Sequence, residues 1–226
     1  MEKKVIFWDF DGTLVKSNRS FLCSLQQAAA DQGAELGENS MNDFLKTACS
    51  WYHPQDSYPE MTGEKWWESL LGKTDTYLKG QAVEESKIES ILGGFRQNAV
   101  HYDYVLYEDA KRILQLAKEK GYRNYILSNN FPELQERVMQ LGLESYVEGC
   151  FLSSEIGYEK PRKEIFSYAL AKTGNPSLCF MVGDNPVADI RGAGAVGMKT
   201  ILVHGKKPDA GADWNLCSLI EIAGVI

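Results

Sequence analysis

The hydrophobic and polar positions of this chain follow two alternating patterns. Short apolar runs without polar alternation are typical of strands buried on both faces of a parallel sheet. Such runs are found at residues 5–8, 122–127, 151–152, 178–182 and 200–203. Between and after most of them, apolar residues recur at helical spacing, over residues 107–120, 132–141, 161–172, 186–195 and 215–223. Strands that alternate with helices predict an α/β fold, with a doubly wound, Rossmann-like parallel sheet covered by helices on both faces.

Residues 16–99 show helical spacing without a convincing strand. The expected helices begin at Ser17 or Asn18, at Asn39 or Ser40, at Thr62 and at Glu84, and the third of them ends at Gly72. A segment of this length is about the size of a small domain. The sequence therefore predicts a core of residues 1–15 and 100–226, interrupted after its first strand by an all-helical insertion at 16–99.

Polar side chains follow three of the predicted strands. Asp9 and Asp11 follow the first strand, Ser128 and Asn129 the second, and Asp184 a later one. Each group taken alone favours turn or helix-cap chemistry. Together they favour a ligand site, because ligands of open α/β sheets bind beyond the carboxyl ends of the strands. Buried carboxylates also need a compensating cation, for which Mg2+ is a common choice.

Lys160 precedes Pro161 at the start of a predicted helix, between Ser128 and Asp184 in the chain. A lysine there is usually a solvated surface charge. At this place in the chain, a cation would balance the carboxylates and hold a phosphate.

These four groups, taken in order, resemble the four motifs of the haloacid dehalogenase-like (HAD) hydrolase superfamily. Asp9-Phe-Asp-Gly-Thr-Leu14 is similar to its first motif, and Ser128 to the hydroxyl of its second. Lys160 is similar to its third-motif lysine, and Gly183-Asp184-Asn-Pro-Val-Ala-Asp189 to its acidic fourth motif. The helical insertion resembles the type-1 cap of the phosphoglycolate phosphatase and beta-phosphoglucomutase branches.

The resemblance implies a Mg2+-dependent phosphatase that hydrolyses a small phosphorylated metabolite through an aspartyl-phosphate. In this interpretation Asp9 is the nucleophile and Asp11 the general acid and base. Asp9, the backbone carbonyl of Asp11 and Asp184 would hold the Mg2+.

The remaining motif residues take supporting roles by the same resemblance. Ser128, the backbone N–H of Asn129 and Lys160 would bind the phosphate oxygens. Thr13 and Asp189 would support the groups that touch the substrate or metal, with Asp189 orienting Lys160 or a metal-bound water.

Two cations near the start of the insertion are candidate substrate-binding residues. Lys16 stands where many relatives carry an acidic residue, and Arg19 lies about one helical turn further on. Solvated helix-end residues are the alternative for both, and the sequence slightly favours it. The insertion's aromatic residues, such as Trp51, Tyr52, Trp66 and Trp67, either line a substrate pocket or form its core, and their helical spacing favours the core.

Composition narrows the class further. The chain has 226 residues, a formal net charge of −7 and no basic block, which disfavours nucleic acid as a partner. Its five cysteines are an odd number without Cys-x-x-Cys spacing, so we expect a reduced, cytoplasmic environment. No apolar run approaches membrane-spanning length. We expect a monomer or homodimer.

Three other interpretations remain. A sugar-phosphate mutase would use the same aspartyl-phosphate without releasing inorganic phosphate. A signalling receiver also combines acids, a hydroxyl and a lysine on a parallel sheet, but it would be shorter and carry its acceptor on a later strand. A non-catalytic binding protein of the same fold should lack at least one of Asp9, Asp11, Lys160 and Asp184, and all four are present.

Overall fold

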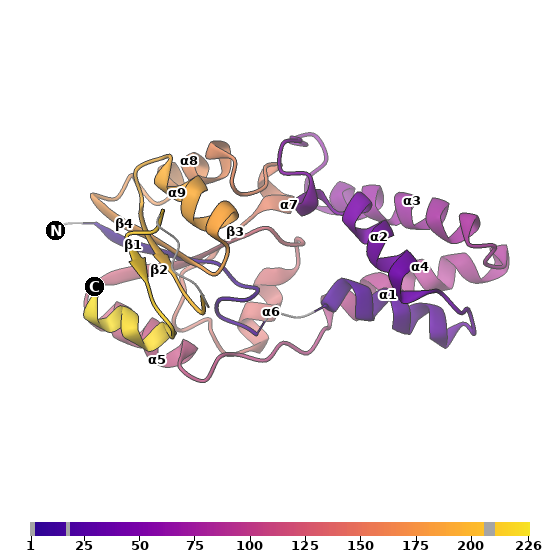
Figure 1. Ribbon diagram of the computed structural model, residues 1–226, viewed down its shortest axis with the longest axis horizontal. Coiled ribbons are helices and arrows are strands. Elements are labelled where there is room, and N and C mark those ends of the chain that lie inside the picture. Colours follow the sequence, from indigo (N-terminus) through magenta and orange to yellow (C-terminus); the bar gives the residue numbers. More distant parts are fainter. Residues whose placement is uncertain (1–2, 17–18, 206–210) are drawn as a thin grey trace.

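A computed structural model describes residues 3–16, 19–205 and 211–226, and in them six parallel strands form one sheet of order β3-β2-β1-β4-β5-β6 (Figure 1). The strands are β1 (Lys4–Trp8), β2 (Tyr122–Ser128), β3 (Cys150–Leu152), β4 (Leu178–Gly183), β5 (Lys199–Leu202) and β6 (Trp214–Asn215). The predicted doubly wound α/β core is therefore confirmed.

Helices cover both faces of the sheet. The helical elements of the core are α5 (Ala110–Glu119), α6 (Leu134–Gln140), α7 (Ser153–Ile156), α8 (Lys163–Lys172), the π-helical η2 (Pro186–Arg191), α9 (Gly192–Gly194) and the 3-10 helix η3 (Leu219–Gly224). Ile6 and Trp8 of β1 pack into the cluster that includes residues of α5, α6 and η3. Val5 and Phe7 pack into the opposite cluster, with residues of α8 and α9. Alternate side chains thus meet apolar neighbours on both faces, which explains the continuous apolar run.

The insertion is a helical lobe that projects from the carboxyl edge of the sheet (Figure 1). Its helices are α1 (Ser20–Asp31), α2 (Glu38–Ala48), the 3-10 turn η1 (Ser50–Tyr52), α3 (Glu64–Gly80) and α4 (Glu85–Val100). Phe21 lies at the centre of an aromatic cluster, with Trp67 stacked on it at 5.9 Å and Phe95 edge-on at 5.8 Å. Phe131, which follows β2 in the core, packs against Phe21 at 6.0 Å, so the two parts share a continuous apolar interior.

The two connections between core and insertion are hydrogen-bonded to each other. Lys16 N–H donates to the Val105 carbonyl at 2.8 Å, and Tyr107 N–H to the Leu14 carbonyl at 3.0 Å. The outgoing and returning chains therefore form a short antiparallel pair at the base of the lobe.

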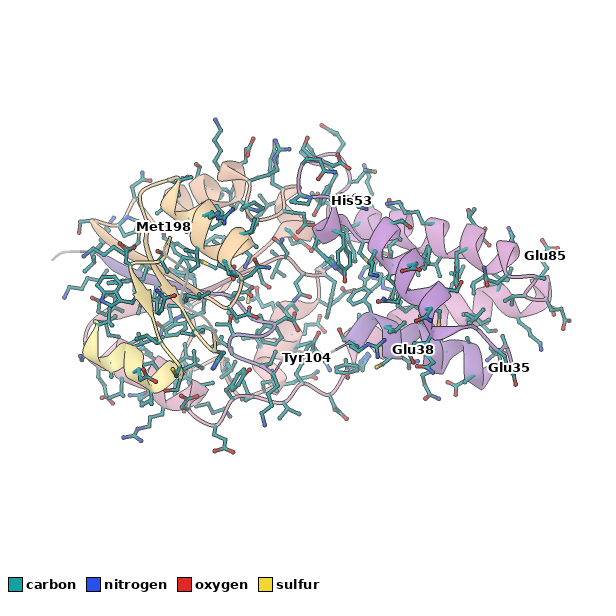
Figure 2. The ribbon with its side chains drawn as sticks, in the orientation of Figure 1. Glu35, Glu38, His53, Glu85, Tyr104 and Met198 are labelled. Atoms are coloured by element: carbon teal, nitrogen blue, oxygen red, sulfur yellow. The ribbon has the colours of Figure 1, made fainter. Side chains whose placement is uncertain are left out.

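A second attachment lies on another side of the lobe. Residues 53–63, which we term the docking loop, lie on core residues 153–162. Tyr58 N–H donates to the Gly157 carbonyl and Gly63 N–H to the Ser154 carbonyl, both at 2.9 Å. In Figure 2, His53 of the docking loop lies above the junction between core and lobe, and Tyr104 of the returning connection lies below it.

The side chain of Tyr58 strengthens the docking loop's attachment. Its hydroxyl donates to the buried carboxylate of Glu159, which directly precedes Lys160. The Arg162 guanidinium donates to the Gln55 carbonyl at 2.7 Å.

Several predicted boundaries are wrong. Helix α3 continues through Gly72 to Gly80, because burial of Thr74 and Leu78 outweighs a mid-helix glycine cost of about 1 kcal/mol. Helix α2 begins at Glu38, so Asn39 and Ser40 lie in its first turn rather than at its cap.

The core also contains boundary differences. The predicted helix 215–223 is a shorter 3-10 helix, preceded by the two-residue edge strand β6, which is too short to show a periodicity. The helix expected from Pro161 begins at Lys163. The caps predicted at Ser17 or Asn18 lie outside the described residues. No helix in the described ranges combines the length and apolarity needed to cross a bilayer.

Candidate functional site

The sheet order brings three sets of predicted residues together. Strand β1 lies between β2 and β4, and Trp8 is aligned with Ile126 on one side and Val182 on the other. Asp9, Ser128 and Asp184 therefore stand at the carboxyl ends of three adjacent strands, as the sequence predicts.

The loop after β1 passes close to Asp184. Gly12 has a φ of +80°, and a Cβ there would lie 2.4 Å from an Asp184 carboxylate oxygen. Only glycine fits this conformation and this space. The Thr13 hydroxyl donates to Asp184 at 3.4 Å, so Thr13 supports the carboxylate from behind.

Lys160 lies at the centre of a buried ion-pair network. Its ammonium donates to Asp9 Oδ1 at 2.7 Å, Asp189 Oδ1 at 2.6 Å and the Leu127 carbonyl at 2.9 Å. An ammonium has three donors, so all of them are used. The side chain is only 2% exposed, and the solvated surface charge considered above is excluded.

Two further residues fix this network. The Asn129 side chain accepts from Lys160 N–H at 2.7 Å and donates to the Lys160 carbonyl at 3.0 Å. The second oxygen of Asp189 accepts from Asn185 N–H at 3.0 Å. A Cβ at Gly183 would lie 2.1 Å from Asp189, so glycine is needed there.

Burial and the neighbouring charge of Asp9 raise the pKa values of Asp184 and Asp189. Burial, together with the charge of Asp9, raises the pKa of Asp184 to about 6. Burial also raises the pKa of Asp189, although the Lys160 charge opposes it. Burial alone would lower the pKa of Lys160, but the charges of Asp189 and Asp9 outweigh it and raise that pKa.

The carboxylates of Asp9, Asp184 and Asp189 each bring one oxygen within 4.8 Å of the others. Hard oxygen donors at this spacing fit a divalent cation such as Mg2+. Lys160 brings one positive charge to three carboxylates, so a divalent cation would balance the remaining negative charge. Asp189 already accepts from Lys160 and Asn185, so Asp9 and Asp184 are the carboxylates of the cluster that fit the Mg2+ that the sequence predicts.

Asp11 faces a different partner. The Asn130 amide nitrogen donates to Asp11 Oδ2 at 2.7 Å, while its carbonyl oxygen accepts from Phe131 N–H at 3.1 Å. The backbone contact fixes which end of the amide faces Asp11. Among the described residues, the Asp11 carboxylate is not part of the three-aspartate cluster.

These residues open into a cavity of about 610 Å3 between core and insertion. The core wall includes Asp9, Asp11, Ser128, Asn129, Asn130, Lys160, Asp184 and Asp189. The insertion wall includes Arg19, Phe21, Asn42, Cys49, Trp51 and Tyr52. All predicted core-site residues except Thr13 thus line one cavity.

The two candidate cations of the insertion differ. Arg19 lines the cavity, and its guanidinium pairs with Glu38 at 2.6 Å. Lys16 is exposed and is not among the lining residues of the described chain.

Sequence reasoning missed several residues. Asn130 continues the polar run after β2, so its position could have suggested a contact with Asp11. The aromatic residues of the insertion serve both predicted purposes: Trp66 and Trp67 are buried in its core, whereas Trp51 and Tyr52 line the cavity. Helical spacing carries no signal for this division, because Trp51 and Tyr52 lie in a 3-10 turn.

The doubly wound sheet, with aspartates and a buried lysine at its carboxyl edge and a helical lobe inserted after its first strand, defines a class of α/β proteins. The sequence model of the haloacid dehalogenase-like hydrolases matches residues 3–197. The chain therefore belongs to this family.

Individual relatives have diverse names. A phosphoserine phosphatase of Thermus thermophilus is 34% identical over 125 residues, which cover 53% of this chain and 50% of the relative. The pyrimidine 5'-nucleotidase YjjG of Escherichia coli is 38% identical over 104 residues, covering 43% of this chain and 46% of the relative. The chain thus spans about half the length of these two relatives.

Solved structures extend the similarity to the whole chain. The HAD-hydrolase YfnB of Bacillus subtilis, in a structure described as bound to magnesium, has a TM-score of 0.71 with 19% identity. The alignment covers 100% of this chain and 99% of YfnB. At this identity the similarity establishes the fold.

Proposed function

We propose that this protein is a Mg2+-dependent phosphatase that hydrolyses a small phosphate monoester through an aspartyl-phosphate. The observation that carries the proposal is the buried Asp9–Lys160–Asp189 network beside Asp11 and Asp184, open to a cavity of about 610 Å3. The family membership and the two relatives named as a phosphatase and a nucleotidase support the same reaction class.

Asp9 is the nucleophile. One of its oxygens accepts from Lys160, and its side chain reaches the cavity. Its carboxylate attacks phosphorus, a new O–P bond forms, and the bond from phosphorus to the ester oxygen breaks. The product of this step is an aspartyl-phosphate and a free alcohol.

Asp11 supplies and removes the proton. It protonates the departing ester oxygen, and in the second step it takes a proton from the water that attacks the aspartyl-phosphate. Asn130 orients the Asp11 carboxylate by donating to its Oδ2 at 2.7 Å. Inorganic phosphate then leaves, and Asp9 is regenerated.

Fixed hydrogen-bond donors and a cation stabilise the negative charge on the phosphate oxygens. Ser128 and the backbone N–H of Asn129 donate to these oxygens, and the Lys160 ammonium attracts them by its positive charge, because its three donors already have acceptors. The Asn129 side chain holds the Lys160 backbone in place. Asp9, Asp184 and the Asp11 carbonyl would hold Mg2+, which lets an anionic nucleophile approach an anionic phosphate.

The insertion at residues 16–99 acts as a cap on the core of residues 1–15 and 100–226, and it recognises the part of the substrate that does not react. Closing the cavity excludes water and strengthens the electrostatics at Asp9. The insertion wall of the cavity is largely apolar and aromatic, whereas the core wall carries the aspartates and Lys160. This difference is expected if the core performs the reaction and the cap selects the substrate.

The test is phosphate release from a panel of phosphate esters with Mg2+, with EDTA and with Ca2+ in place of Mg2+. Turnover is expected only with Mg2+, because Ca2+ prefers more ligands at longer distances and would draw both Asp9 oxygens into coordination. Full activity in EDTA would contradict the metal assignment. Isomerised sugar phosphate without accumulated inorganic phosphate would show a mutase instead.

A further inference from the structure

The insertion wall of the cavity is aromatic rather than charged. Phe21, Trp51 and Tyr52 line it, and Asn42 adds an amide. Arg19 is the charged side chain that the described insertion residues contribute to this wall, and Glu38 already pairs with it at 2.6 Å. A substrate with a second strongly anionic group would meet little compensation there. The wall instead suits a leaving group that is planar and largely uncharged.

Trp51 is held as a fixed ring. Trp66 stacks on it with centroids 5.9 Å apart and an interplanar angle of 26°, and Phe21 contacts it edge-on at 4.9 Å. The Trp66 indole N–H donates to the Ser50 hydroxyl at 3.1 Å, so the ring on which Trp51 stacks is itself fixed. Trp51 itself remains partly exposed and lines the cavity. A preorganised ring costs little entropy when a second ring stacks on it.

The cavity has room for a ligand much larger than a phosphate. Its volume of about 610 Å3 lies within the range of about 300–1000 Å3 that accommodates ligands of drug size. The same cavity joins the phosphate end at Asp9 and Lys160 to the ring of Trp51. A ligand that fills it needs a phosphate at one end and a flat ring system at the other.

We propose that the substrates are nucleoside monophosphates, with the phosphate at Asp9 and the base stacked on Trp51. This inference rests on the proposed phosphatase function and names the substrate class of the same site. Stacking is sequence-tolerant because every base has a flat π-face. Trp51 therefore selects for a base, and it does not by itself select one base over another.

The experiment compares two nucleotides with a sugar phosphate that lacks the base. We measure kcat/KM for uridine and adenosine 5'-monophosphates and for ribose 5-phosphate, with Mg2+, and use the nucleotide-to-sugar ratio as the readout. We expect a ratio of at least about tenfold, in line with the energy of stacking one base on an aromatic side chain. Trp51→Leu should lower this ratio about tenfold, and Trp51→Phe, which keeps a ring, should retain most of it.

The control is Tyr168→Ala, which removes an exposed aromatic ring on α8, outside the cavity lining. It should leave the ratio unchanged. A wild-type ratio near one, or an unchanged ratio in Trp51→Leu, would overturn the inference.

A binding measurement covers the case in which Trp51 variants fail to fold. Calorimetry on the full-length Asp9→Asn protein should give at least about tenfold tighter binding of uridine monophosphate than of ribose 5-phosphate. Equal affinities would overturn the inference. If p-nitrophenyl phosphate and ribose 5-phosphate are hydrolysed without nucleotide preference, only the substrate class is wrong. If no phosphate ester is hydrolysed, the phosphatase proposal itself is wrong, and this inference falls with it.

Discussion

The two walls of the cavity hold their side chains in place by different means. On the core wall, Lys160 uses every donor of its ammonium, and Asp189 accepts on both oxygens. On the insertion wall, Trp51 is held by ring packing, and few polar pairs are involved. Directional hydrogen bonds fix atoms for a reaction, whereas packed rings provide a surface. The difference indicates that chemistry and selectivity can be disturbed separately by mutation.

The largest effect is expected on the core wall, from Asp9→Asn. The amide cannot act as the nucleophile, so kcat should fall by about three orders of magnitude or more. The fold should persist because Lys160 keeps Asp189 and the Leu127 carbonyl as partners. Steady-state phosphate release measures kcat, and circular dichroism checks the fold. Asp43→Asn, an exposed carboxylate on α2 paired only with Lys46 among the interactions described, is the matched control and should remain fully active.

Asp11→Asn should have the next largest effect, and it should depend on the leaving group. Loss of general acid catalysis costs about 100- to 10,000-fold for an alkyl phosphate. p-Nitrophenolate leaves without a proton, so the aspartyl-phosphate should form from p-nitrophenyl phosphate and then hydrolyse slowly. Rapid-quench kinetics should show a burst followed by a slow phase. An equal loss in the rate of aspartyl-phosphate formation for both leaving groups would contradict the acid role of Asp11.

The acidic cluster makes a prediction about metal affinity and pH. Asp184 has a pKa raised to about 6 by burial and by Asp9, so it is protonated below pH 6 in the metal-free protein. A proton then competes with Mg2+. The apparent affinity for Mg2+ should weaken about tenfold per pH unit as pH falls below about 6, and stay level above it. Calorimetric titration of Mg2+ between pH 5 and 8 measures this, and Asp184→Asn should weaken affinity and remove the transition near pH 6.

The smallest effect on activity is expected at the docking loop, which joins the insertion to the core. Tyr58→Phe removes the hydroxyl that donates to the buried Glu159 carboxylate, which leaves that carboxylate short of a partner. The free energy of unfolding should fall by about 1–3 kcal/mol. Urea denaturation measures the loss, and Tyr168→Phe, at an exposed ring, is the matched control. Tyr58→Phe should change kcat on p-nitrophenyl phosphate little, because Lys160 keeps its three acceptors; a loss as large as that of Asp11→Asn would place Tyr58 in the catalytic machinery.

The contrast between the walls also explains how much the sequence could predict. Buried parallel strands have a simple apolar signature, and polar residues directly after them must meet at one edge of the sheet. Asp9, Ser128 and Asp184 were found in this way, and the family resemblance gave Lys160 its place. Helical spacing predicts the helical lobe, although it also predicts a helix end at Gly72, where α3 continues because Thr74 and Leu78 are buried.

The insertion wall could not be predicted by the same reasoning. Trp51 and Trp66 belong to one aromatic stack, yet only Trp51 lines the cavity, and this depends on how η1 and α3 pack in three dimensions. The docking loop is likewise a tertiary contact, in which Tyr58 meets a glutamate about a hundred residues away. Neither local periodicity nor residue type carries that information.

The position of β1 in the sheet has a consequence for biosynthesis. Its two neighbours, β2 and β4, come much later in the chain, and Trp8 aligns with Val182. At about 5–20 residues per second, translation leaves Trp8 without this partner for on the order of ten seconds. During this interval the nascent chain carries the apolar segment Val5–Trp8 with its backbone groups unpaired, a pattern prone to aggregation. The helical lobe is synthesised in that interval and can form from local contacts, so Phe21 and its neighbours offer the emerging chain an early folded unit while the central strand waits for its partners.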